Sequence, residues 1–236
     1  PLSTNPPKIF ATMTRKFTKG RKMSKIYNLN ADTKVIAKSV VSKRIFDCEN
    51  AHVDVFAFDT GEELDHEMLF CDSLAWVVEG GASLHYGEKQ MRLVGEEACL
   101  IEKKVWRKLV FNEPTKYVSI DFKEDLMIDH LPKAAIFSLV DAVEYEEGKI
   151  VSKTLVKNEN GSMSLLSFDT DQELSTHAAP GDALLIALDG EMKLTIGDEH
   201  FDIKKGDTIV LPGKIPHGLK IKDKFKMLLI VTKDKM

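Results

Sequence analysis

The sequence predicts an all-β protein made of two tandem copies of one barrel or sandwich unit. Three observations lead to this prediction. The chain repeats itself at an offset of 110 residues, its apolar segments are short and often alternate with polar residues, and turn dipeptides such as Asn-Gly and Asp-Gly separate them. Short strands with turns between them are typical of sandwiches and barrels rather than of βαβ units.

The repeat is visible in matched segments of the two copies. "FDTGEEL" at 58–64 matches "FDTDQEL" at 168–174, with an offset of 110. Further on, "GEEACLIEKKVW" at 95–106 resembles "GDTIVLPGKIPH" at 206–217, with an offset of 111. We therefore expect a slip of one residue in a turn, where an added residue costs little.

Both copies supply the same series of strands. In the first copy, the expected strands are "HVDVFAF", "LAWVV", "ASLHY" and "YVSIDF". In the second copy, they are "SMSLLSF", "ALLIAL", "MKLTI", "DTIVL" and "FKMLLIVT". Each run is short, and Val, Ile, Phe and Tyr are frequent in them, as expected for strands.

The repeat also sets the expected domain boundaries. Residues 1–24 form a basic N-terminal extension, residues 25–122 the first barrel and residues 135–236 the second. Between the barrels, "KEDLMIDHLPKA" at 123–134 spaces its apolar side chains as a helix does until Pro132 stops it. We expect this segment to be a short helical connector.

Composition and charge exclude several classes of partner. Of the 236 residues, 43% are hydrophobic and 30% charged, which is ordinary for a globular chain. Residues 1–30 carry seven Lys or Arg and no acid, so the net charge of −4 leaves −11 for the rest. Such an acidic body disfavours nucleic acid as a partner. No apolar run approaches the ~18 residues of a membrane-spanning helix, so we expect no membrane span.

Cysteine usage and the N-terminal segment bear on location. Cys48, Cys71 and Cys99 are scattered and form no C-x-x-C pair, which favours a reducing compartment. Residues 1–22 are basic, free of acids and precede Met23. They are either an extension ahead of a later start or an organellar targeting segment. We expect a cytoplasmic protein, with an organellar location as the alternative.

Two motifs in the second copy resemble those of the cupin superfamily, whose members fold as small jelly-roll (double-stranded β-helix) barrels. The family's first motif has the form G-x5-H-x-H-x3-E-x6-G, and the second G-x5-P-x-G-x2-H. "GDTIVLPGKIPH" matches the second motif with Gly206, Pro212 and His217. Counting back thirteen residues from Gly190 places His177 at the first ligand position. The chain thus resembles a cupin with two tandem barrels, or bicupin.

The resemblance implies a metal site from which two ligands are missing. In the family, three histidines and a carboxylate hold the ion, a set that suits Fe, Mn, Ni or Zn. Here Ala179 stands at the second histidine position and Ala183 at the carboxylate position, and Lys214 replaces the inner glycine of the second motif. The site is therefore degenerate.

His177 and His217 remain as candidate site residues of the second barrel. Two imidazoles alone would hold a divalent transition metal weakly, so a further donor would be needed. Asp182 and Gln172 are the additional candidates for binding, although alternation aims Asp182 away from the face of residue 183. Without a metal, the histidines would hydrogen-bond each other, water or an anionic ligand.

The first copy departs further from the family pattern. Glu67 occupies the slot of His177, and at the offset of 111 Trp106 occupies that of His217. An indole cannot bind a metal, so we expect the first barrel to be structural. Trp76 lies on an apolar strand and is expected in the core, with a residual cavity as the alternative.

The leading functional hypothesis is a small-molecule-binding bicupin with its site at the mouth of the second barrel. The first alternative is a metal-dependent cupin enzyme of the dioxygenase, isomerase or decarboxylase type. The second alternative is a structural or assembly protein without catalysis. The resemblance also implies a homodimer. Motifs of serine hydrolases, P-loop NTPases and HExxH metalloproteases do not occur in the chain.

Overall fold

The computed structural model describes residues 24–48, 51–123, 134–158 and 161–232 of the chain. These residues form strands and turns and contain no α-helix, so the prediction of an all-β protein is confirmed. In the described ranges, no helix has the length and apolar character needed to cross a membrane. The expected helical connector at 123–134 lies almost entirely outside the described residues.

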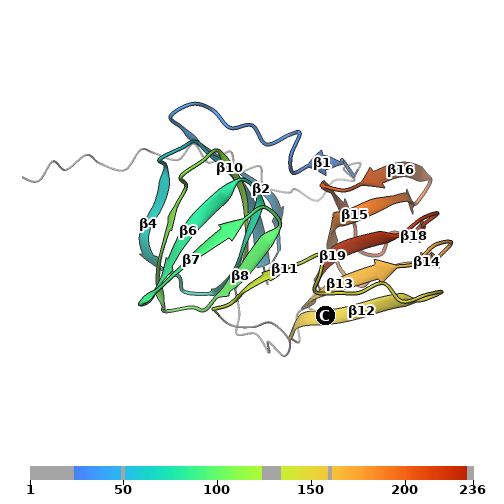
Figure 1. Cartoon of the computed structure of the whole chain (residues 1–236). Coiled ribbons are helices and arrows are strands. Elements are labelled where there is room, and N and C mark those ends of the chain that lie inside the picture. The colour runs from blue at the N-terminus through green and yellow to red at the C-terminus, as the bar shows by residue number, and fades with distance from the viewer. Residues whose placement is uncertain (1–23, 49–50, 124–133, 159–160, 233–236) are drawn as a thin grey trace, which may run out of the picture.

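Strands β1–β19 build two barrels side by side (Figure 1). The strands of the N-terminal barrel are β2 (Val40–Asp47), β3 (Ala51–Phe58), β4 (Glu63–Met68), β5 (Asp72–Glu79), β6 (Gly81–Tyr86), β7 (Lys89–Val94), β8 (Glu97–Ile101), β9 (Trp106–Val110) and β10 (Thr115–Phe122). Those of the C-terminal barrel are β12 (Ile150–Asn158), β13 (Gly161–Phe168), β14 (Glu173–His177), β15 (Ala183–Ile196), β16 (Glu199–Lys204), β17 (Asp207–Leu211), β18 (His217–Lys220) and β19 (Phe225–Thr232).

Two short strands, β1 (Tyr27–Asn28) and β11 (Ile136–Ser138), each join the barrel that the other half of the chain forms. β1 pairs with β17, and β11 pairs with β8, at the edge of the six-stranded sheet. Figure 1 shows both segments reaching across. The segment before each barrel thus caps an open sheet edge of the other barrel, which removes that edge from solvent.

The two barrels correspond residue by residue at a constant offset of 110. β8 and β17 have equivalent bounds, and so do β3 and β13. Left-handed backbone positions pair at the same offset: Lys38 with Gly148, Gly61 with Asp171, Gly80 with Gly190, Gly87 with Gly197, Glu96 with Gly206, and Lys104 with Lys214. The expected slip to an offset of 111 is therefore wrong. It arose from aligning Gly95 with Gly206, whereas Glu96 holds the left-handed position in the first copy.

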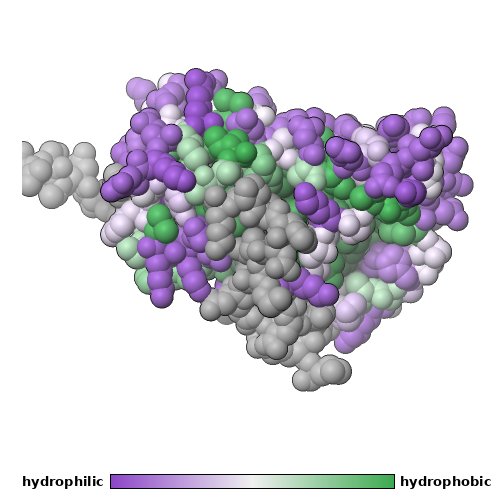
Figure 2. Space-filling view, turned by 60° about the horizontal axis from the view of Figure 1, so that its bottom comes forward, coloured by the Kyte–Doolittle hydropathy of each residue, from purple (hydrophilic) through white to green (hydrophobic). Residues whose placement is uncertain are grey.

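Three apolar cores are formed by the residues that the structure describes. One fills each barrel, and the third lies between the barrels, where Val53, Val55 and Ile120 of the first pack with Leu184 and Ile230 of the second. This third group is called the shared core below. Trp76, expected in the core, belongs to it and is 5% exposed. The face in Figure 2 is mostly hydrophilic, with hydrophobic residues in small patches, which agrees with burial of the apolar strand faces.

Candidate functional site

The two candidate histidines meet at one end of the C-terminal barrel. His177 ends β14 and His217 begins β18, and the antiparallel register places the two residues directly opposite each other. Their ring centroids are 4.6 Å apart, and the ring planes meet at 61°. The count from Gly190 for His177 and the second motif for His217 thus point to two side chains that the fold brings together from 40 residues apart.

Each ring is held in one tautomer by the backbone carbonyl two residues before it. Nδ1 of His177 lies 2.9 Å from the carbonyl oxygen of Ser175, and Nδ1 of His217 lies 3.0 Å from that of Ile215. A carbonyl oxygen can only accept, so each Nδ1 carries a proton and donates it. The neutral rings therefore keep a lone pair on Nε2, the arrangement that ligand-binding histidines use.

The two histidines differ in their exposure. His177 is exposed, whereas His217 is only 4% exposed. Burial lowers the pKa of His217; the hydrogen bond to the Ile215 carbonyl raises it, and the neighbouring His177 lowers it again, with a net decrease. His217 thus favours the neutral form, which offers a lone pair rather than a positive charge.

The side chains of the other two predicted site residues, Asp182 and Gln172, form their hydrogen bonds with backbone groups and not with the two imidazoles. Oδ1 of Asp182 accepts a hydrogen bond of 2.7 Å from the backbone N–H of Gly213, and its carbonyl accepts from Thr232. The Gln172 side chain donates to the carbonyl of Thr170 at 3.4 Å. Asp182 therefore stabilises the turn that precedes β18, and Gln172 hydrogen-bonds within its own loop.

The donor set does not fit a resident transition metal. Such sites use three or four protein ligands, and this barrel offers the Nε2 atoms of His177 and His217, with alanine at the other two family positions. Among the residues that the structure describes, no third His, Cys, Asp or Glu has a ligand atom close enough to complete a group with them. The two imidazoles at this end of the C-terminal barrel are consequently a pair of hydrogen-bond acceptors.

The equivalent place in the N-terminal barrel holds an ion pair. The register of β4 and β9 sets Glu67 opposite Arg107, as β14 and β18 set His177 opposite His217. Oε1 of Glu67 accepts from Arg107 Nη2 at 2.7 Å and from Nε at 3.1 Å. Arg107, and not Trp106, therefore occupies the position that His217 has in the other barrel. Trp106 is 53% exposed, because neighbouring residues of a strand face opposite sides.

A chain of buried hydroxyl groups continues inward from Arg107. Arg107 Nη1 lies 3.5 Å from the phenol oxygen of Tyr117, the hydroxyls of Ser73 and Ser119 are 3.1 Å apart, and Ser119 donates to Asp121 at 2.8 Å. The sequence reasoning missed this network. The signal in the sequence is the alternation of polar residues in "YVSIDF", whose polar face lines the barrel.

Comparisons with known proteins identify the family to which this fold belongs. The family model "Cupin domain" matches residues 164–232. A solved structure, the cupin 2 conserved barrel domain protein from Leptotrichia buccalis, is 31% identical, with 89% of this chain and 96% of that chain covered and a TM-score of 0.79. No curated protein matches the chain. The chain belongs to the cupin superfamily.

Two more distant structures share the fold alone. Salicylate 1,2-dioxygenase from Pseudaminobacter salicylatoxidans is 11% identical, with 77% of this chain and 70% of that chain covered and a TM-score of 0.60. AerE from Microcystis aeruginosa is 13% identical, with 85% and 97% covered and a TM-score of 0.57. At such identities the barrel is shared, whereas chemistry depends on the residues of each site.

Proposed function

We propose that the protein is a cupin that binds a small polar molecule at the mouth of its C-terminal barrel, through His177 and His217. The observation that carries the proposal is the pair of imidazoles with Nδ1 bound to backbone carbonyls and Nε2 left to accept. A ligand hydroxyl or amine donating to these lone pairs would form bonds that no residue in the described part of the chain provides there.

The composition of the mouth supports a ligand with both polar and apolar parts. His177 lies at the exposed rim and His217 beneath it, while Ala179 and Ala183 stand where metal-binding relatives have an imidazole and a carboxylate. The barrel interior below is apolar. A small alcohol, hydroxy acid or amine would place its donor on the imidazoles and its carbon skeleton toward the alanines.

Ligand-observed NMR with a library of small hydroxy acids, alcohols and amines tests the proposal. The full chain is compared with a His177→Ala, His217→Ala double variant and with a His200→Ala control, which removes an exposed histidine of the same barrel. Compounds that bind the wild type and the control are expected to lose binding in the double variant. Equal binding by all three proteins, or no binding by any, would refute the proposal.

The wild type and the double variant also distinguish this function from metal-dependent catalysis. Metal analysis of protein purified without chelator is expected to find no Fe, Mn, Ni or Zn that depends on the two histidines. Stoichiometric metal that disappears in the double variant would instead favour a metal-dependent cupin enzyme.

A further inference from the structure

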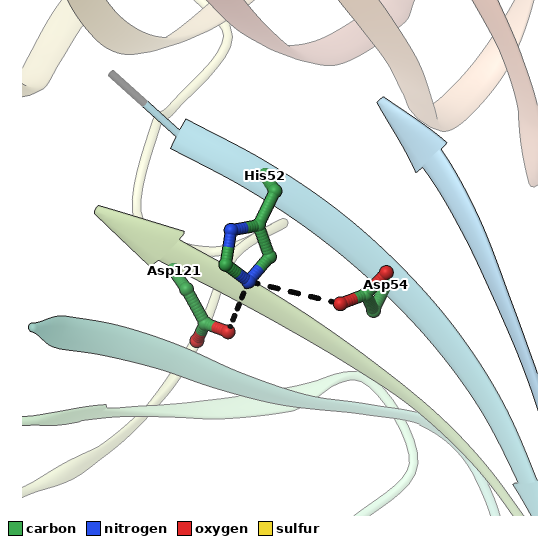
Figure 3. Close-up of side chains that lie close together, drawn as sticks. All are labelled: His52, Asp54 and Asp121. Atoms are coloured by element: carbon green, nitrogen blue, oxygen red, sulfur yellow. Dashed lines mark hydrogen bonds and ion pairs between the residues drawn. The ribbon is translucent and has the colours of Figure 1, made fainter. Parts of the chain in front are cut away.

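A second group of titratable side chains lies in the N-terminal barrel. His52 and Asp54 are on β3 and Asp121 is on β10, directly opposite His52 in the antiparallel register. Figure 3 shows the imidazole between the two carboxylates. Its Nε2 atom is 2.8 Å from Oδ2 of Asp121 and 3.7 Å from Oδ2 of Asp54.

These side chains face the interior of the barrel rather than the shared core. His52 and Asp54 alternate with Val53, so they share a strand face with Phe56 and Phe58, which pack in the N-terminal barrel. The three side chains are 15–19% exposed. The group is thus largely enclosed but still reached by solvent and by a small ion.

The three donor atoms have the spacing that a metal ion requires. They lie within 4.8 Å of one another, which no other group of His, Cys, Asp and Glu ligand atoms achieves in the described part of the chain. An ion bound at ~2.0–2.2 Å to nitrogen and oxygen sets its ligands roughly 3–3.5 Å apart. The separations of 2.8 and 3.7 Å from Nε2 therefore bracket the required value.

Neighbouring groups orient both carboxylates. Arg44 binds both oxygens of Asp54, at 2.9 and 2.8 Å, and Ser119 donates to Oδ1 of Asp121, which leaves Oδ2 to face the imidazole. Burial raises the pKa of Asp121, but hydrogen bonds from His52, Ser73 and Ser119 outweigh it and hold the pKa below its usual value. One oxygen of each carboxylate is thus directed at the imidazole.

The imidazole can present a lone pair to an ion. Nδ1 of His52 is buried and has no hydrogen-bond partner among the described residues, so only the contact of Nε2 with Asp121 places the ring proton. In the absence of a metal, Nε2 carries the proton and donates to Asp121. When Nε2 binds a metal, the neutral ring carries its proton on Nδ1 instead, at the cost of one unpaired N–H.

The second barrel serves as an internal control for the fold. At the offset of 110, the positions of His52, Asp54 and Asp121 hold Ser162, Ser164 and Val231, which pair in the same register. The same strands therefore form without any of these charges. Building an imidazole and two carboxylates into the first barrel is consequently a feature of that barrel and not a requirement of its strands.

The geometry points to a divalent cation site formed by Nε2 of His52, Oδ2 of Asp54 and Oδ2 of Asp121, with water in the remaining positions. One imidazole and two carboxylates suit Zn²⁺ or Mn²⁺ better than soft or purely oxygen-seeking ions. This site is separate from the family's usual ligand positions, which Glu67 and Arg107 occupy in this barrel. It is also independent of ligand binding at His177 and His217.

Calorimetric titration with ZnCl2, and separately MnCl2, tests the site in full-length protein freed of metal by chelator. We expect one ion per chain in the wild type and affinity at least about tenfold weaker in Asp121→Asn and in Asp54→Asn. Asp202→Asn, a matched change at an exposed carboxylate of the other barrel, and the His177→Ala, His217→Ala variant are expected to bind as the wild type does. Circular dichroism shows whether each variant is folded.

Three results would overturn the inference. They are the absence of binding to the wild type, unchanged affinity in both folded carboxylate variants, and loss of binding in the histidine double variant alone. If neither carboxylate variant folds, an anomalous difference map from a zinc-soaked crystal of the wild type decides. A peak among His52, Asp54 and Asp121 supports the site, and a map without one there rejects it.

Discussion

At the scale of single residues, equivalent positions in the two barrels differ in charge: one barrel has a pair of imidazoles and the other an ion pair. In the C-terminal barrel the facing pair is His177 and His217, both able to be neutral, and in the N-terminal barrel it is the ion pair of Glu67 and Arg107. The guanidinium is 6% exposed, whereas the carboxylate is 45% exposed. The buried guanidinium thus has its counter-charge at the rim, whereas burial disfavours the charged form of the His217 imidazole.

The His217 pKa predicts a loss of stability in acid. Because the pKa of His217 is lower in the folded than in the unfolded chain, the unfolded state binds more protons as the pH falls below ~6.5. The contribution of this residue to stability is therefore complete above that pH and declines below it. Urea denaturation at a series of pH values should show a shallower decline between pH 7 and pH 5 in His217→Gln. An unchanged slope would contradict the prediction.

The ion pair of the N-terminal barrel predicts non-additive stabilities. Glu67→Gln is expected to destabilise the fold by about 1–3 kcal/mol, since it leaves Arg107 buried without its counter-charge. Adding Arg107→Met removes that charge as well, so the double variant should be less destabilised than the sum of the single changes. Chemical denaturation of the four proteins measures the coupling, and strictly additive losses would show that the pair contributes nothing.

At the scale of elements, the long strand β15 passes through a bulge that turns it from one sheet to the next. Its register to β19 shifts between Ala187 and Asp189, and Gly190 follows with a φ of +72°. The first half of the strand pairs with β17 and the second half with β16 and β18. The bend therefore positions β18, and with it His217, over the barrel mouth.

Substitution of Gly190 by alanine should destabilise the fold more than the same change at Gly148, which has a similar φ but open space around it. A Cβ at Gly190 would collide with the carbonyl oxygen of Lys224, and φ is left-handed, so Gly190→Ala should cost about 3 kcal/mol. Gly148→Ala, with φ of +67° and nothing within 4 Å, should cost only about 1–2 kcal/mol. Equal losses in urea denaturation would mean that the close approach in β15 is not tight.

The strands and motifs could be predicted from the sequence, whereas the face of each strand that lines the barrel could not. The strands, the repeat and the pair His177 and His217 follow from spacing, because period-two alternation and motif counts are local properties. Which face of a strand is covered by another part of the molecule depends on tertiary contacts and not on local sequence. In "AHVDVFAF" the apolar face of Val53 and Val55 packs against the other barrel, so the face of His52 and Asp54 lines the interior. Sequence alone does not show that both faces of this sheet are covered.

At the scale of the whole molecule, the barrels are related as two subunits that have exchanged a strand. β1 and β11 cap each other's barrel at equivalent edges, and the shared core lies between them. This arrangement is self-complementary, as the interface of a two-fold dimer is. The homodimer that the family resemblance implied for the full chain stays a prediction, and any such contact would need a different surface.

The exchange predicts the behaviour of one half of the chain. A fragment of residues 134–236 keeps β11 but loses β8, and its own β17 edge and its side of the shared core become exposed. We expect it to dimerise, with β11 of each copy pairing with β17 of the other, as β1 does in the full chain. Sedimentation should show a dimer, weakened in a fragment that begins at 141 and lacks β11. A stable, soluble monomer of the longer fragment would contradict this.

The shared core also couples events at opposite ends of the molecule. Because side chains from both halves fill one apolar space, neither half can open fully without exposing residues of the other. The slowest-exchanging amide hydrogens of β3 and β13 should consequently report one common opening free energy. A molecule seated in either barrel would then slow amide exchange throughout both, so that occupancy of one mouth is felt as rigidity at the far end.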